Sequence, residues 1–546
     1  MEIRDIRIIL VKRNDFWVSI LESEGIPFKI IHSVMDIPPN TKNQIIITWF
    51  KASKLEKFTI NALRNNGNVL LVKDSQLENF SSMNFKQVFF DYSKIDFGLL
   101  NDFNNDSKVS YKYINNGPSL LLGLYSKVEN YWSNSQKSYK KICLDVKNQI
   151  YCTESLNRKV KYNIRLYIRD ALIKCFAHFD LPLIYIWRFP EDKANVCNLR
   201  IDVDPDRNTA EDIAFERIVN TIEYAKENAD KTTFFVNFYK RKNNLDFISL
   251  YKEYNFDIQN HNYFHCLYPT YSHNLKNFEL GHNLLLRNSI NSVGFSAPEY
   301  FWYNSTKRIL EKYNYKYSHS FGLDYNNYPY RPIVGKQIAK YIEIPNDPLV
   351  FSKLISSYKN ISPEEITKIY IQSLLDKINS YDIPCIKYEH PNVLGKFPII
   401  MNQIYSLFNS FDDVVPITLT KWASWLEKRN EIINDISIGY IKNSYGDTLK
   451  IESSINGNIL AKYGIALQYD SKEIHVKSFD NKTQQEFNLK NFKKFVVKEN
   501  ELLLNKVVFQ NDEKKIGVFH SLKHLKKLIS NYKLFYKYKK ERFYLD

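Results

Sequence analysis

Short apolar segments that read as buried strands alternate with longer amphipathic segments along most of the chain, and this alternation limits the possible folds most strongly. It is clearest in residues 196–430. Strand, helix and strand in succession form the repeating unit of parallel α/β folds, whose active sites lie at the carboxyl ends of the strands. We therefore expect a parallel α/β domain here, with its chemistry at the strand ends.

The rest of the chain divides into regions of different pattern, as expected for 546 residues, which are too many for one ordinary core. Residues 1–105 alternate strands and helices and predict a small doubly wound, Rossmann-like accessory domain, with no glycine-rich nucleotide motif. Residues 106–195 form a mixed connecting region. Residues 433–517 contain short strands separated by turn residues, which predicts a small β-sandwich-like domain.

The last region, residues 518–546, is a basic, aromatic segment that predicts a terminal helix. Between Leu522 and Phe543 it carries eight Lys or Arg residues and one acid, with apolar residues at helical spacing. Two interpretations stay open. The helix packs its apolar stripe on the protein and leaves its lysines in solvent, or it makes peripheral contact with an anionic membrane.

Charge and segment composition limit the surroundings of the protein. The 76 basic and 60 acidic residues give a net charge of +16, but the excess is spread thinly and no nucleic-acid motif is present, so nucleic acid is not an expected partner. The chain shows no signal peptide and no stretch that approaches 18 consecutive apolar residues. Its six cysteines form no C-x-x-C pair. We expect a cytoplasmic protein, which would meet a membrane at its inner face.

Two carboxylates lie at the end of the first strand-like segment of residues 196–430. Arg200, Asp202 and Asp204 alternate and therefore share one face of a strand, which Pro205 ends. Two acids on one face repel each other, and a bound metal would neutralise them. The alternative is an exposed strand end with solvated acids.

Two histidines, His261 and His265, follow another strand-like segment. They are four residues apart, which corresponds to one helical turn, so both imidazoles can reach one ion. One carboxylate and two histidines make a three-ligand site with an open position for water, as catalytic zinc uses. The second carboxylate is then available as a base. A third histidine, His390, also follows a strand-like segment and could act as a general acid, or it is an ordinary loop residue.

In this order, these segments resemble the polysaccharide deacetylase, or NodB-homology, family of carbohydrate esterases. The resemblance covers about residues 196–428. Besides the motifs above it includes the segments 232–236, 294–298, 315–320 and 389–391, and Trp422 and Trp425 within a helix. It implies a distorted (β/α) barrel and a divalent metal, most often Zn²⁺. Asp204, His261 and His265 would bind this metal, and Asp202 would be the catalytic base.

The resemblance also implies a reaction. Water activated by the metal and the base would attack an acetyl carbonyl, and His390 would protonate the leaving amine, with Asp324 as a candidate partner of that histidine. The substrate would be an acetylated sugar or glycan intermediate, N-acetyl rather than O-acetyl, and a lipid-linked glycan would explain membrane contact. A hydrolase of a non-sugar amide would use the same metal site.

The sequence departs from the family at Ser296, where the family usually has an arginine that pairs with the base. Arg200 lies on the same strand face as Asp202 and could replace that arginine, or it could pair with a surface acid. Glu299 also suggests a changed rim of the pocket. The departure motivates an alternative function: a catalytically silent glycan-binding or assembly protein on the same barrel.

Overall fold

In the computed structural model, the strands of the described residues form six sheets, with helices around them. The described residues are 7–73, 111–115, 120–124, 137–146, 149–158, 164–204, 211–239, 244–268, 270–298, 304–320, 328–334, 337–345, 347, 350–357, 361–378, 384–441, 448–454, 463–469, 472–476, 484–488, 494–496, 507–508, 526 and 529–536.

The N-terminal sheet is doubly wound, as predicted. Its strands, in the order β2-β1-β3-β4-β6-β5, are parallel except for β5. Alternate strand residues face opposite sides of the sheet. Ile45 and Ile47 belong to the apolar core that contains the helix of residues 15–24, and Ile46 belongs to the core that contains the helix of residues 54–65. The elements are β1 (Ile8–Val11), α1 (Asp15–Glu24), β2 (Phe28–Ile31), η1 (Val34–Asp36), β3 (Ile45–Thr48), α2 (Lys54–Asn65), β4 (Val69–Lys73), β5 (Tyr111–Asn115) and β6 (Leu120–Leu124).

The central domain is a parallel barrel, which confirms the predicted fold class. Its strands follow the order β17-β14-β13-β12-β11-β10-β18. Strand β19 pairs with the first residues of β10, before the part of β10 that pairs with β18. The strands are β10 (Asn195–Val203), β11 (Thr232–Val236), β12 (Asp257–Asn260), β13 (Gly294–Ser296), β14 (Tyr317–Ser320), β17 (Ile342–Pro345), β18 (Cys385–Glu389) and β19 (Val414–Pro416). All of these pairings are parallel, so the carboxyl ends of the strands share one end of the barrel.

A short contact brings the two ends of this curved sheet together. The backbone N–H of Asp347, just beyond β17, donates to the carbonyl of Ile386 in β18 at 2.8 Å. The carboxylate of Asp347 accepts from Lys387 Nζ at 2.8 Å, and both side chains are buried. The barrel is thus nearly closed and distorted at this seam.

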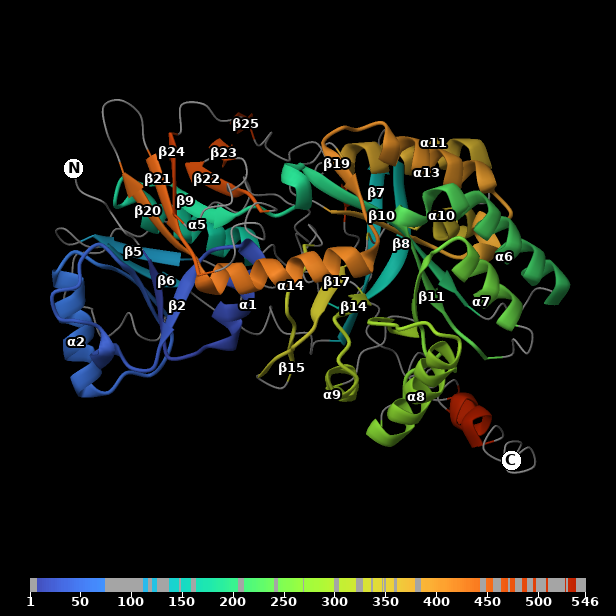
Figure 1. The fold of residues 1–546 in the computed structure, drawn as a ribbon, viewed down its shortest axis with the longest axis horizontal. Coiled ribbons are helices and arrows are strands. Elements are labelled where there is room, and N and C mark those ends of the chain that lie inside the picture. The colour runs from blue at the N-terminus through green and yellow to red at the C-terminus, as the bar shows by residue number, and fades with distance from the viewer. Residues whose placement is uncertain are drawn as a thin grey trace.

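Helices surround the barrel (Figure 1). They are α6 (Glu211–Ala225), η5 (Lys226–Lys231), α7 (Asn244–Glu253), α8 (Tyr271–Arg287), α9 (Asn304–Lys312), α10 (Phe351–Ser357), α11 (Pro363–Ile378), α12 (Pro391–Leu394), α13 (Pro398–Asn409) and α14 (Leu419–Asp435). Helices α6 and α13 bury an apolar face against the outer side of the strands, in a core that includes Leu199, Ile201 and Val203. The inner side of β10 is thereby left for polar residues.

Small antiparallel sheets combine the connecting region with the C-terminal region. Strand β9 (Leu183–Ile186) pairs with β22 (Ile465–Tyr469), in the order β25-β23-β22-β9. The remaining elements of these two regions are β7 (Lys137–Val146), β8 (Gln149–Arg158), α5 (Ile164–Ala177), η4 (Pro190–Asp192), β20 (Ser437–Ile441), β21 (Thr448–Glu452), β23 (Lys472–Val476), β24 (Gln484–Asn488), β25 (Lys494–Val496) and β26 (Val507–Val508). Between β14 and β17 of the barrel, β15 (Ile333–Val334) and β16 (Gln337–Ile338) form a separate antiparallel pair. The predicted division at residues 195 and 433 therefore separates strands that pair with each other.

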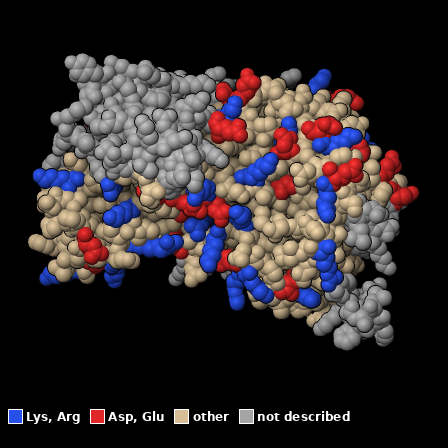
Figure 2. Space-filling model, viewed as in Figure 1, with Lys and Arg blue, Asp and Glu red and all other residues tan. Residues whose placement is uncertain are grey.

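Charged side chains of both signs are mixed on the surface of the barrel. On the face shown in Figure 2, Lys and Arg side chains are interspersed with Asp and Glu over the barrel. Among the helices that the structure describes, none combines the length and the apolar character needed to cross a membrane.

Arg429 of α14 links the barrel to the N-terminal domain. Helix α14 runs across the middle of the molecule between these two parts (Figure 1). The buried guanidinium donates to the carbonyls of Glu22 and Ser23 at the end of α1, and to those of Ile186 and Trp187 at the end of β9, at 2.9–3.2 Å. Gly25 permits this approach, because a Cβ there would lie 2.0 Å from the guanidinium.

We predict that Arg429→Met lowers the free energy of unfolding by about 3 kcal/mol or more, because buried carbonyls lose their donor. Thermal unfolding followed by scanning calorimetry measures this effect. Lys428→Met is the matched control, since Lys428 forms an exposed ion pair with Glu431 and its loss should cost within about 0.5 kcal/mol. Equal midpoints for the two variants would contradict the assigned role of Arg429.

Candidate metal centre

Strand β10 brings three polar side chains into the barrel. Leu199, Ile201 and Val203 lie in the outer apolar core, so the intervening residues Arg200 and Asp202 face inward, and both are buried. Asp204 follows directly after the strand, at the carboxyl end of the barrel. The predicted alternation along β10 is therefore confirmed, and the alternative of a solvated strand end does not apply to Asp202.

The histidine pair lies in an irregular loop and not on a helix. His261 follows β12, and residues 261–268 contain no helical turn, so the helical interpretation of the four-residue spacing was wrong. Asn262 has a left-handed backbone with φ of 63°. The strand end and this turn, rather than a helical repeat, bring both rings to one place.

Asparagine side chains hold this loop. Asn237 donates to the carbonyls of His261 and Asn262 at 3.1 and 3.0 Å. Asn277 of α8 accepts from the N–H of Phe264 at 2.6 Å and donates to the carbonyls of Phe264 and Cys266 at 3.1 and 2.9 Å. These buried amides supply the partners that an irregular backbone needs. They were not predicted from the sequence, although polar residues that flank a strand end were an available signal.

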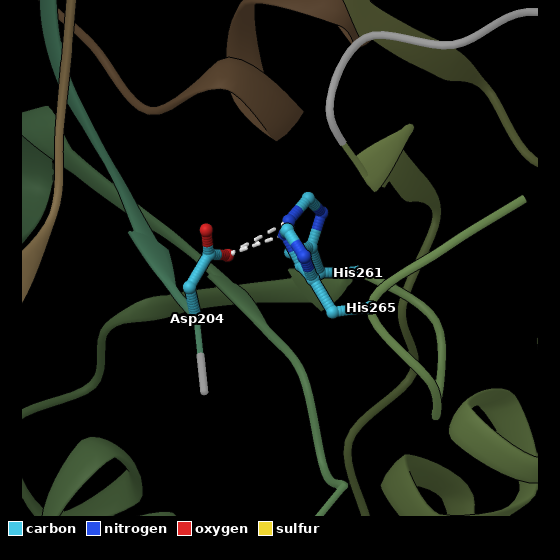
Figure 3. Close-up of side chains that lie close together, drawn as sticks. All are labelled: Asp204, His261 and His265. Carbon is cyan, nitrogen blue, oxygen red and sulfur yellow. Dashed lines mark ion pairs between the residues drawn. The ribbon is translucent and has the colours of Figure 1, made fainter. Parts of the chain in front are cut away.

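The predicted ligands converge on one point (Figure 3). Oδ1 of Asp204 lies 3.1 Å from Nε2 of His261 and 3.0 Å from Nε2 of His265. One ligand atom from each residue lies within 4.8 Å of the others. The geometry thus brings together the three residues named from the sequence.

The protonation of His261 tests whether these residues suit a metal. Its Nδ1 lies 2.8 Å from the carbonyl oxygen of Ser296, and a carbonyl only accepts, so Nδ1 carries a proton. In the neutral ring, Nε2 therefore points a lone pair at the carboxylate of Asp204. Two facing lone-pair donors repel unless a proton or a cation lies between them. The donor set of two imidazoles and one carboxylate fits a divalent metal such as Zn²⁺.

Without a metal, a proton takes the place of the cation between the imidazoles and the carboxylate of Asp204. Burial would raise the pKa of Asp204, but the charge of His265 and hydrogen bonds from the imidazoles hold it well below its usual range. Burial would lower the pKa of His261, but the charge of Asp202 and its contacts with Asp204 raise it. His261 therefore holds its proton more tightly, and a metal would have to displace that proton.

Arg200 pairs with Asp202 rather than with a surface acid. Its Nε donates to Oδ1 of Asp202 at 2.9 Å, and its Nη2 contacts both Oδ2 of Asp202 and Oγ of Ser296. The guanidinium carbon lies 5.0 Å from the ring centre of Phe235 and 4.7 Å from that of Tyr388. A buried cation thus occupies an aromatic cage beside the acid, which settles the alternative left open for Arg200.

His390 joins the same cluster from β18. Its Nε2 lies 3.3 Å from Oδ2 of Asp204 and 3.1 Å from the hydroxyl of Tyr388. Burial lowers the pKa of His390, but the hydrogen bond and charge of Asp204 raise it overall. Tyr388 was not predicted as a site residue. Its alternation with His390 along β18 was the available signal. Asp324 lies outside the described residues.

A second set of possible ligands consists of Asp202, Asp204 and His390. It shares Asp204 with the first set. Arg200 already contacts both oxygens of Asp202, which leaves this carboxylate less available to a metal. The set with His261 and His265 is therefore the better candidate, and Asp202 and His390 lie beside it.

Comparisons with known proteins give only distant matches. No protein-family model matches the sequence, and a search of curated proteins found no similar sequence. Solved structures that resemble the chain include a polysaccharide deacetylase from Mycobacterium smegmatis, with 16% identity, 44% of this chain and 93% of that chain covered, and a TM-score of 0.37. An allantoinase matches with 12% identity, 43% and 91% coverage and a TM-score of 0.36.

Another similar structure is a CE4 family pseudoenzyme from Bacillus anthracis, with 14% identity, 43% and 66% coverage and a TM-score of 0.29. Because all three TM-scores are below 0.5, the function proposed below rests on the side chains of the site.

We predict that metal binding releases protons and strengthens as pH rises. Because the pKa values of His261 and His390 are raised, protonation stabilises the metal-free site below the ordinary histidine pKa. This stabilisation is lost as pH rises through the raised pKa values. Calorimetric titration with Zn²⁺ at about pH 6, 7 and 8, in buffers of different ionisation enthalpy, measures both effects. An affinity that does not change with pH, with no proton release, would contradict the assigned ligands.

Proposed function

We propose that the protein is a metal-dependent hydrolase that removes acetyl groups from a sugar or glycan intermediate, N-acetyl rather than O-acetyl. The observation that carries this proposal is the facing pair of Asp204 and His261, beside a second carboxylate held by a buried arginine. A ligand set and a separate acid–base pair in one place are the requirements for hydrolysis of an amide by water.

Asp204, His261 and His265 would hold the metal. Zn²⁺ suits two imidazole nitrogens and one carboxylate oxygen, and a bound divalent ion would supply Lewis acidity and a water of lowered pKa. Ser296 would contribute through its carbonyl, which fixes the tautomer of His261. The charge of the site agrees with this assignment: Arg200 neutralises Asp202, and Asp204 leaves one negative charge for a cation.

Asp202 would act as the general base. Its Oδ2 lies 3.7 Å from Nε2 of His261, so it is next to the ligand set without belonging to it. Arg200 directs both oxygens through a two-point contact, which limits rotation of the carboxylate. From this position Asp202 would take a proton from the water that attacks the acetyl carbon.

His390 would act as the general acid. Its raised pKa favours the imidazolium form, which can give a proton to the leaving nitrogen. Tyr388 and Asp204 are its partners among the described residues. Asp324 remains our candidate for a further partner on the sequence resemblance alone.

The finer parts of the proposal concern substrate and location. We propose a cytoplasmic enzyme whose acetylated substrate is lipid-linked, with the basic C-terminal tail at an anionic membrane surface. The alternative, a catalytically silent glycan-binding or assembly protein, was motivated by Ser296. The case for a silent protein is weaker because Arg200 donates to Asp202, as the missing arginine would, and also donates to the hydroxyl of Ser296. A non-sugar amide as substrate would use the same residues.

Asp202→Asn and Asp204→Ala test the two carboxylate roles. We expect both to reduce acetate release from N-acetylglucosamine oligomers by at least about a hundredfold, since each removes a group that acts on water. Added Zn²⁺ should not restore Asp202→Asn. Acetate release is measured with a coupled assay, with 4-nitrophenyl acetate as the ester comparison. Undiminished turnover in either variant would refute its role, and no release from any acetylated probe by the Zn²⁺-loaded wild type would favour a silent binding protein.

Arg200→Lys tests the arginine without removing its charge. Lysine cannot make the two-point contact with Asp202, so we expect kcat to fall about 10- to 100-fold while bound metal is retained. Kinetic measurement together with metal analysis separates orientation from metal loss. An unchanged kcat would show that Asp202 needs no such partner.

A further inference from the structure

The loop with both histidines lacks regular structure, and His265 is the less firmly held of the two ligands. His261 is fixed by the Ser296 carbonyl and by its own backbone N–H, which donates to Val236 at 3.2 Å. Among the described residues, Nδ1 of His265 makes no hydrogen bond; the aromatic contact of its ring is with His261, with centres 5.0 Å apart, and its Nε2 pairs with Asp204. The position of His265 therefore depends on the neighbours of its own backbone.

Those neighbours are fully buried aromatic residues. Phe264 and Tyr268 are 0% exposed, although they belong to an irregular loop at the carboxyl end of the barrel strands. Asn277 holds the backbone on both sides of His265. Hydrogen bonds to α8 thus hold one side of the loop, and another element must cover its rings.

The far end of the chain supplies that cover. Residues 529–536 form a helix, drawn in red beside α8 in Figure 1. The ring of Phe535 lies 6.0 Å from that of Phe264 and 5.6 Å from that of Tyr268, and the ring of Tyr532 lies 5.2 Å from that of Tyr268. The hydroxyl of Tyr268 donates to the carbonyl of Asn531 at 3.2 Å.

The same helix packs against the first turn of α8. His273 lies 4.9 Å, centre to centre, from both Tyr532 and Phe535. The apolar cluster of Phe264, Cys266 and Tyr268 includes Tyr532, Leu534 and Phe535 from this helix. Ile529 remains 47% exposed and Lys533 is exposed, so the opposite face is open. Among the described residues, the ring contacts of this helix to other elements go to Phe264 and Tyr268 of the loop and to His273 of α8.

We propose that the C-terminal helix is a positioning element for the metal ligand His265. It covers Phe264 and Tyr268, on either side of the ligand, and so restricts the loop backbone that sets the position of the imidazole. An irregular segment is ordered by its tertiary contacts, and loss of such contacts opens it locally without global unfolding. This inference rests on the proposed metal site. It assigns the helix a role in the site, in addition to any contact that its basic residues make elsewhere.

The test uses the full chain with Tyr532→Ala/Phe535→Ala. Hydrogen exchange of the metal-free protein should become faster in residues 262–268 and remain unchanged in β10 and β11. Dissociation of Co²⁺ or Zn²⁺ into a chelator should become about tenfold faster, and the visible spectrum of the Co²⁺ form should change, because supporting residues tune their ligands. Tyr532→Phe/Phe535→Tyr retains both rings and should restore the wild-type rates.

Ile529→Ala/Lys533→Ala, on the exposed face, is the matched control and should behave as wild type. Unchanged exchange in residues 262–268 of the alanine variant would overturn the proposal. Faster exchange with unchanged metal dissociation would also overturn it, because the helix would then order the loop without positioning the ligand. Failure of the wild type to bind either metal would instead refute the proposed metal site, and the exchange experiment would still report whether the helix holds the loop.

Discussion

The hydrogen bond between Nδ1 of His261 and the carbonyl of Ser296 is the interaction on which the site depends. It connects β12 with β13 and decides which nitrogen of the ring carries the proton. Nε2 is then directed at the carboxylate of Asp204. The two groups repel each other unless a proton or a metal lies between them. The tautomer of one buried histidine thus links the geometry of the barrel to the chemistry proposed for it.

The barrel makes this arrangement possible because its strands are parallel. Asp204, His261, Ser296 and His390 follow or end different strands, and parallel pairing brings those ends to one side. Burial then makes each charge costly, so the site contains its own compensation: Arg200 for Asp202, and protonated histidines or a metal for Asp204. The same site residue, Ser296, serves both pairs, through its carbonyl for His261 and its hydroxyl for Arg200.

Much of this could be predicted from local pattern. Alternation along residues 200–204 placed Arg200 and Asp202 on one face, because strand periodicity depends only on neighbouring residues. The spacing of His261 and His265 predicted that both rings reach one point, and they do, but a turn at Asn262 replaces the expected helix. Pairing between distant segments, such as β9 with β22, has no local signal, and neither has the cover that residues 529–536 give to Phe264. Tyr388 was overlooked because an aromatic residue in a strand is usually a core residue.

The central claim is that Asp204, His261 and His265 form a metal site. Metal content of the purified protein, measured by inductively coupled plasma mass spectrometry beside a His261→Ala/His265→Ala variant, tests it most directly. The account predicts about one divalent ion per chain in the wild type and none in the variant, because the carboxylate alone is a weak site. Absence of metal from the wild type, even after incubation with zinc, would contradict the account.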